Sequence, residues 1–359
     1  MIEMEDECLY INSITNSYPN NILKEFDYSD EATLAITIIN QELTELFNFV
    51  EPGLFNNKII VVKNLKDKPI FSLEESISLK MNKAKLFNFN QDIVIQLFSD
   101  RNILMWEDTE YSSIFKCNDN ITYLYENNKE KFFLKGKEVD VTICAFGSRF
   151  SDEFNNLEKQ LNNYYLHKVK YSSCPILQQA WSSEKRIFFK GGGKDIPEKY
   201  IQESLHNFIK DLSIFKGEVG QFDPTREHNL NASKPVDIIV RWEKSNRIAL
   251  IEIKWLGKSI HEGEFKSKFN NSRANYGYKQ LKEYFDLAKR DNPNKIIKCY
   301  LVVIDARRWQ TSESTSVISY SNGMYYLNKD IKLDDDKKYH LLYKNMNQPI
   351  RMFVEPICD

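Results

Sequence analysis

Apolar side chains recur at helical spacing in three segments of the chain, and each segment is predicted to be a helix. The segments are residues 30–50, residues 154–166 and a stretch that starts near residue 195. The third helix is expected to start at Asp195, because Asp195 and Glu198 form a capping-box pattern. A fourth helix is expected over residues 275–290. The stripe residues are Leu34, Ile38, Leu43 and Leu46 in the first helix, Phe154, Leu157, Leu161 and Tyr165 in the second, and Ile201, Leu205, Phe208, Ile209 and Leu212 in the third.

Between these helices, short β-branched and apolar runs predict strands. The runs 236–242 and 247–255 are separated by four residues, so they are predicted to form an antiparallel hairpin. From about residue 195 to residue 305 the predicted order is helix, strand, strand, strand, helix, strand. The other predicted strands cover residues 58–62, 92–97, 121–125, 139–145, 217–222 and 296–304.

The chain has 359 residues, more than one ordinary domain holds, so two domains are expected. The predicted boundary is the Ser-rich segment that follows residue 170. Residues 1–170 are expected to form a mixed α+β domain with a regulatory, specificity or partner-binding role. Residues 171–359 are expected to form an α/β domain that carries the chemistry.

Composition excludes several classes of protein. The chain is 42% hydrophobic and 28% charged, as soluble folded proteins are. Its apolar runs are all shorter than the roughly 20 residues of a membrane span, and the acidic start does not have the pattern of a secretory signal. The six cysteines are far apart and form no Cys-x-x-Cys pair. We therefore expect a cytoplasmic protein with reduced thiols and no membrane association.

Charge is distributed unevenly along the chain. Residues 1–57 hold eleven acidic residues and one basic residue, whereas residues 151–310 hold 28 Lys or Arg and 20 Asp or Glu. A solvated acidic surface on one domain is one explanation. The other is that the basic half binds a polyanion such as nucleic acid.

The predicted hairpin brings two carboxylates together. If its turn is centred between residues 244 and 245, Asp237 lies directly opposite Glu252, with Cβ atoms roughly 5 Å apart. Like charges in this position repel each other, and a divalent cation such as Mg²⁺ would offset the repulsion. Lys254 lies on the same strand face as Glu252. The three groups could together carry out metal-assisted hydrolysis of a phosphodiester.

The charged pair has an alternative explanation, and its spacing occurs twice. The alternative is that Glu252 and Lys254 lie on the solvated face of an edge strand. The Glu-x-Lys spacing recurs at Glu264 and Lys266, in a polar stretch that is not predicted to be a strand. The first copy differs because it lies inside an apolar strand, where a charged pair needs a reason.

The segment Pro235-Val-Asp237 followed by Glu252-Ile-Lys254 resembles the signature of the PD-(D/E)xK nuclease superfamily, with one Val inserted in the usual Pro-Asp. The resemblance implies a restriction-endonuclease-like core of helix, three strands, helix and strand, which is the order predicted above. It also implies that Asp237 and Glu252 hold Mg²⁺ or Mn²⁺, and that Lys254 assists the attacking water. It covers roughly a third of the chain.

Two helical positions extend the resemblance. The first helix of the superfamily often supplies a Glu near the metal, and Glu203 matches it, although a solvated surface Glu is the alternative. RecB-type nucleases carry Gln-x-x-x-Tyr in the helix after the Glu-x-Lys strand, which implies catalytic roles for Gln280 and Tyr284. Residues at this spacing share one helical face. The same pattern occurs at Gln160 and Tyr164, so position rather than pattern favours Gln280.

A basic segment surrounds the proposed site, and it is expected to contact the phosphate backbone of a nucleic acid. The alternative is the surface of a Lys-rich protein. The leading hypothesis is a Mg²⁺- or Mn²⁺-dependent nuclease, favouring DNA and endonucleolytic cleavage, that resembles a bacterial or phage-defence or restriction-type effector. A non-catalytic nucleic-acid-binding or assembly subunit and an RNase are the rivals, and a homo-oligomer or a partner protein bound through the N-terminal domain is left open. The predicted substrate contacts are Lys258, Lys266, Lys268, Arg273 and Lys279.

Overall fold

The computed structural model divides the chain into two compact units, Met1–Ser151 and Asp152–Asp359. The boundary lies upstream of the predicted one at residue 170, because the connecting helix α3 (Glu153–Tyr164) packs against a helix of the second unit. Each unit contains one sheet with helices, so the protein is of the mixed α/β class. The structure describes residues 30–47, 51, 57–78, 91–100, 102–107, 109–127, 129–139, 153–192, 196–215, 223–229, 235–242 and 245–359.

The first unit is a seven-stranded sheet in the order β2-β4-β3-β1-β5-β6-β7, with helix α2 (Asp30–Phe47) packed on it. β1 and β3 are parallel, and the other neighbouring strands of this sheet are antiparallel. The strands are β1 (Ile59–Asn64), β2 (Ile77–Ser78), β3 (Ile93–Leu97), β4 (Ile103–Glu107), β5 (Asn120–Glu126), β6 (Lys129–Leu134) and β7 (Lys137–Val139), with short helices η2 (Leu73–Glu75) and η4 (Ile114–Lys116) between them.

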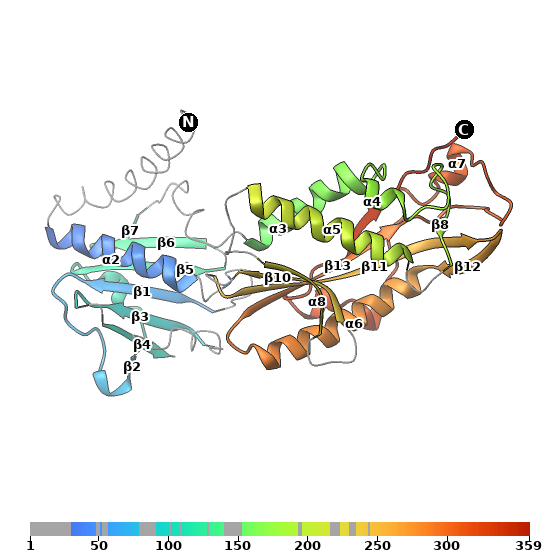
Figure 1. The fold of residues 1–359 in the computed structure, drawn as a ribbon. Helices are drawn as coiled ribbons and strands as arrows, with labels where there is room; N and C mark the ends of the chain where they lie inside the picture. Colours follow the sequence, from blue (N-terminus) through green and yellow to red (C-terminus); the bar gives the residue numbers. More distant parts are fainter. Residues whose placement is uncertain are drawn as a thin grey trace, which may run out of the picture. The chain divides into compact units, whose positions relative to one another are not determined.

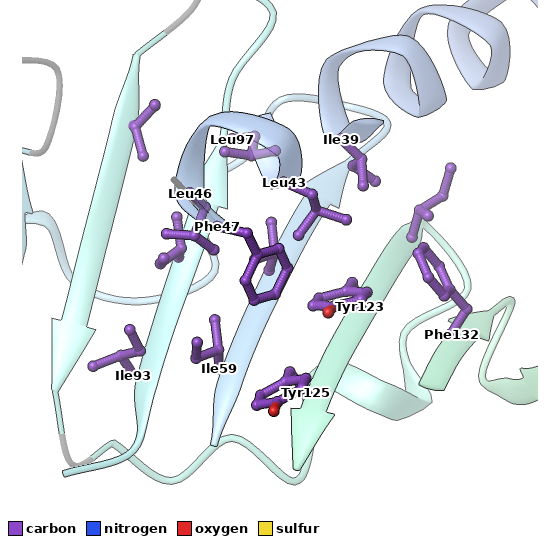
Figure 2. Close-up of a cluster of buried hydrophobic side chains, with 14 of the residues drawn as sticks. Ile39, Leu43, Leu46, Phe47, Ile59, Ile93, Leu97, Tyr123, Tyr125 and Phe132 are labelled. Atoms are coloured by element: carbon purple, nitrogen blue, oxygen red, sulfur yellow. The ribbon is translucent and has the colours of Figure 1, made fainter. Parts of the chain in front are cut away.

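The core of this unit lies between α2 and the sheet. Leu43, Leu46 and Phe47 of the helix pack onto β1, β3 and β5, and the ring of Phe47 meets Tyr123 and Tyr125 edge to face (Figure 2). The prediction that Leu34 belongs to the buried face of this helix was wrong, because Leu34 is 50% exposed. The buried series begins instead at Ala35 and continues at Ile39 and Leu43, because residues four apart share one helical face.

The second unit is a sheet covered on both faces. Its main order is β14-β13-β11-β10-β9, with β8 and β12 paired to the far part of β11. Helix α6 covers one face, and α5 lies with α3 on the other (Figure 1). The strands are β8 (Phe189–Lys190), β9 (Asp223–Asn229), β10 (Pro235–Trp242), β11 (Arg247–His261), β12 (Glu264–Phe269), β13 (Ile296–Asp305) and β14 (Ile350–Phe353); the helices are η5 (Tyr165–Val169), α4 (Pro175–Gln178), α5 (Ile196–Phe215), α6 (Asn271–Asp291), α7 (Tyr320–Gly323), η6 (Asp335–Lys337) and α8 (Tyr339–Leu342).

The order from α5 to β13 agrees with the predicted helix, three strands, helix and strand, with β12 added before α6. β10 is antiparallel to β11, whereas β13 runs parallel to β11 after the crossover through α6. The strand predicted over residues 217–222 and the cap at Asp195 lie outside the described residues, as does most of the strand predicted over residues 139–145. The described strand that follows α5 is β9.

The second Glu-x-Lys copy lies in a strand, which corrects the prediction of a polar stretch without one. Glu264 and Lys266 belong to β12, which folds back on the end of β11 through a two-residue turn at Glu262 and Gly263. Both turn residues have positive φ, +51° and +78°, as a type I′ hairpin requires. This hairpin is exposed on alternate residues, so its charges are solvated, unlike those of the first copy.

Candidate metal centre

The hairpin of β10 and β11 has the predicted register. Each residue pair of the ladder, from Ile238 opposite Ile251 to Trp242 opposite Arg247, has residue numbers that sum to 489. Asp237 and Glu252 are the next residues along the two strands. Beyond the last ladder pair, a carboxylate oxygen of Asp237 accepts a hydrogen bond from the backbone N–H of Ile253, at 2.7 Å. This bond fixes Asp237 beside Glu252.

Glu252 has a buried carboxylate, and only one of its two oxygens has a hydrogen-bond partner among the described residues. Its side chain is 3% exposed; Oε1 lies 2.5 Å from the ammonium of Lys254. Oε2 is buried and has no hydrogen-bond partner among the described residues. Burial, and next the charge of Asp237, raise the pKa of Glu252 well above its usual value. An unpaired buried carboxylate oxygen is costly unless another group binds it.

Lys254 joins the strand β11 to the helix α5. Its ammonium contacts Glu252 on its own strand and Glu198 of α5, the latter at 2.8 Å. Burial acts to lower the pKa of Lys254, but the charges of Glu252, Glu198 and Asp237 outweigh it and raise the pKa. The ammonium is therefore held as a cation among carboxylates.

Glu198 was assigned only to helix capping in the sequence, and the structure adds it to the site. One oxygen binds Lys254, and the other accepts a hydrogen bond from Arg273 of α6 at 2.8 Å. Four residues on, Gln202 donates to the backbone oxygen of Asp237 at 2.8 Å. The i, i+4 spacing of two polar residues buried on an otherwise apolar helix face was the available signal.

Glu203, the predicted helix carboxylate, is one residue after Gln202 and is half-buried. One residue turns the side chain by about 100° around an α-helix, away from the direction of Gln202. The contacts at the centre therefore favour Glu198 over Glu203 as the acidic residue of α5. The predicted metal-ligand role of Glu203 gains no support from them.

Gln280 and Tyr284 lie on the side of α6 that faces the sheet. The Gln280 amide nitrogen is 3.5 Å from the Tyr284 hydroxyl, and Gln280 Oε1 is buried without a hydrogen-bond partner among the described residues. Burial raises the pKa of Tyr284, and the charges of Glu252 and Asp237 raise it further, which places the phenol within their electrostatic reach. The structure thus brings the predicted helical pair toward the two carboxylates.

The predicted substrate contacts separate into two groups. Arg273 is held by Glu198 at the centre itself and lies over the ring of Phe269. Lys258 and Lys268 are directly opposed on β11 and β12, and both ammonium groups lie 4.7 Å from the ring centroid of Phe265. Lys266 and Lys279 are exposed. Four of the five basic residues can thus contribute to a surface outside the centre.

The donor set fits a magnesium-type ion held by few protein ligands. In the part of the chain that the structure describes, no three His, Cys, Asp or Glu side chains form a ready metal-binding group. Mg²⁺, however, is usually bound through one or two carboxylates, with water and substrate phosphate completing its shell. The unpaired oxygen of Glu252 beside Asp237 provides such a pair. These two residues would hold the ion.

Gly277 of α6 gives Lys254 the space that it occupies. A Cβ at Gly277 would lie 2.5 Å from Lys254 Cγ and 3.1 Å from Leu301 Cδ1. Gly277→Ala should therefore lower the free energy of unfolding by about 1–3 kcal/mol through overpacking, although alanine is the better helix former. It should also reduce any activity that depends on Lys254. Chemical denaturation together with activity measurements tests this, and a stabilised, fully active variant would contradict it.

Comparisons of the chain with protein-family models, curated proteins and solved structures find no match. Among the described helices, none is both long and apolar enough to cross a bilayer.

Proposed function

We propose that this protein is a divalent-metal-dependent nuclease of the PD-(D/E)xK superfamily that hydrolyses phosphodiester bonds, in DNA by preference. The observation that carries the proposal is the buried, unpaired oxygen of Glu252 beside Asp237, with Lys254 on the same strand. A solvated edge strand would not bury Glu252 and Lys254. Burial of these charges is costly unless they have a function or full pairing.

The element order supports a restriction-endonuclease-like core in the second unit. α5, β9, β10, β11, α6 and β13 follow the order of that core, and the proposed ligands lie at the junction of β10 and β11. In this proposal the first unit contributes specificity, regulation or partner binding. The described cysteines are free thiols, which agrees with a cytoplasmic location.

The proposed reaction assigns a role to each group. Asp237 and Glu252 would hold Mg²⁺ or Mn²⁺, and the ion would supply Lewis-acid catalysis of phosphodiester hydrolysis. Lys254, held as a cation, orients the attacking water and stabilises negative charge that develops on the phosphate. Glu198 and Arg273 keep the ammonium in position, and Gln280 offers an amide to water or substrate.

One experiment tests the proposal directly. The purified protein is incubated with supercoiled plasmid, linear duplex, single-stranded DNA and RNA, each with Mg²⁺, Mn²⁺ or EDTA. We expect cleavage of DNA only with a divalent cation. Cleavage of RNA alone would correct the substrate, whereas nucleic-acid binding without cleavage of any substrate would favour a binding subunit that retains the fold.

The exposed lysines of β12 are expected to contact the substrate backbone. Each phosphate contact releases condensed counterions, with a slope of about -0.9 in log affinity against log salt on duplex DNA. Replacement of Lys266 and Lys268 by Gln should therefore flatten the slope by about 2 units. Binding is measured at several salt concentrations with Ca²⁺ in place of Mg²⁺.

The control for this double variant is the replacement by Gln of Lys129 and Lys137, two exposed lysines of the first unit. It removes the same charge from a surface to which the proposal assigns no phosphate contact. An equal change of slope in both double variants would mean that the effect comes from net charge, not from contacts at β12.

A further inference from the structure

Trp309 differs from the other four tryptophans of the chain. Trp106, Trp181, Trp242 and Trp255 are buried, with at most 8% of their surface exposed, whereas Trp309 is 39% exposed. It follows β13 on the segment that leads to α7. An exposed indole leaves a large apolar surface in water, and Trp is enriched at binding interfaces because its ring is apolar and its N–H is polar.

One side of the Trp309 ring is already covered, and the covering residues are basic and aromatic. Tyr325 stacks on it with ring centroids 4.4 Å apart and planes within 19°. The ammonium of Lys329 lies over the Tyr325 ring, 3.0 Å from its centroid, and Arg307 lies over the neighbouring ring of Tyr326. A backbone bond from Trp309 to Asn322 holds the two loops together. Lys329, Tyr325 and Trp309 therefore form one stack, in which Trp309 keeps 39% of its surface exposed.

Short chains of contacts connect this stack to the proposed site. Arg307, two residues before Trp309, donates to Asn271 at the start of α6, and Arg273 in the same first turn binds Glu198. On the other side, Lys258 of β11 binds the backbone oxygen of Thr311 at 2.6 Å. The loop that carries α7 also packs against the β12 hairpin, since Ile318 and Phe265 share one hydrophobic cluster (Figure 1).

We propose that Trp309 is a stacking platform for an unpaired nucleobase of the substrate strand, an inference that rests on the proposed nuclease function. A base has a flat π-face for the indole, and its backbone phosphates suit the exposed Lys329 at the stack. They also suit the opposed Lys258 and Lys268, which the bond from Lys258 to Thr311 ties to the segment that carries Trp309. This combination of an aromatic platform with surrounding cations is how proteins bind single strands. Bases inside an intact duplex are stacked on each other, so the platform binds a single-stranded, frayed or everted nucleotide.

Tryptophan fluorescence reports on this site selectively, because only Trp309 is open to an aqueous quencher. The full-length protein is titrated in EDTA with oligothymidylate, oligouridylate and a blunt duplex, and acrylamide quenching is measured at each point. We expect the single strands to protect the fluorescence from acrylamide more than the duplex does. The two single-stranded arms show whether the bound base comes from DNA or RNA. Trp309→Phe should bind but lose the acrylamide-sensitive signal.

Affinity provides the second readout. Trp309→Ala should weaken single-strand binding by roughly 5- to 150-fold, the range measured for loss of one stacked base, and Trp309→Phe should restore most of it. The matched control is Tyr171→Ala, which removes an exposed aromatic ring that also has a lysine over it but that no ring of the described residues stacks on. Its affinity should equal that of the wild type.

Unchanged single-strand affinity in Trp309→Ala would overturn the platform, while metal-dependent cleavage by the same protein would leave the nuclease proposal standing. A wild-type protein that binds no nucleic acid of any kind would overturn both. Equal losses in Trp309→Phe and Trp309→Ala would show that the indole serves packing between loops, and the inference would fail.

Discussion

Glu252→Gln should abolish metal-dependent cleavage while the protein stays folded. Gln keeps the size of the side chain and an oxygen that can accept from Lys254, but it removes the charge that would hold the cation. Loss of several kcal/mol of transition-state stabilisation corresponds to a rate reduction of about 10³-fold or more. The substitution also removes the repulsion from Asp237, so the melting temperature should stay equal or rise.

The second Glu-x-Lys copy offers a matched control. Glu264→Gln makes the same chemical change in a strand of the same unit, where the carboxylate is exposed and bonds only loosely to Lys266 at 3.1 Å. It should cleave like the wild type, and Asp237→Asn should behave like Glu252→Gln. If Glu264→Gln is inactive and Glu252→Gln is active, the wrong copy has been assigned to the site.

The hairpin was predictable because it depends on local rules. Two apolar runs and a four-residue connection fix the register, and the register alone opposes residues 237 and 252. The α-β-β-β-α-β order followed from the same kind of local pattern. In the first unit the same reasoning found the helix α2 but assigned Leu34 to its buried face. A shift of one residue along a helix decides which side chain is buried, and here Ala35 is buried instead of Leu34.

Interactions between distant residues were not predictable in the same way. The pairing of Glu198 with Lys254 joins residues 56 apart, and the pairing of Glu198 with Arg273 joins residues 75 apart. The i, i+4 spacing of Glu198 and Gln202 on α5 was a local signal for the face that meets the sheet, but family analogy pointed to Glu203 instead. The β12 strand was missed because its exposed charged residues alternate with residues that are only half-buried. The alternation of apolar and polar residues along the strand is therefore weak.

Lys254→Met should make the protein strongly unstable without metal, and a divalent cation should reverse part of the loss. Among the described residues, the Lys254 ammonium is the one positive charge that pairs with Glu252. Its removal leaves a buried carboxylate facing Asp237, which typically costs about 3–5 kcal/mol of unfolding free energy. Mg²⁺ or Mn²⁺ should bind this carboxylate pair and replace the missing charge, so the gain in melting temperature on adding metal should exceed that of the wild type.

The stability lost in Lys254→Met should depend on pH, in a direction that follows from the pKa of Glu252. The pKa of Glu252 is raised in the folded protein, so the native state keeps a proton that the unfolded chain releases, and stability falls as the pH rises above the usual value of 4.5. Without Lys254 the pKa rises further, so the deficit of Lys254→Met should be small at pH 5 and large at pH 8. Unfolding is followed by denaturant titration at both pH values, with and without Mg²⁺.

Lys279→Met, which removes an exposed lysine of α6, is the control and should show neither effect. A Lys254→Met protein as stable as the wild type at pH 8, or one that metal does not stabilise, would contradict the two-carboxylate centre. Lys254→Met should remain inactive even when saturating metal has restored its stability, because the metal replaces the charge that stabilises the fold but not the ammonium that is proposed to act on water and phosphate.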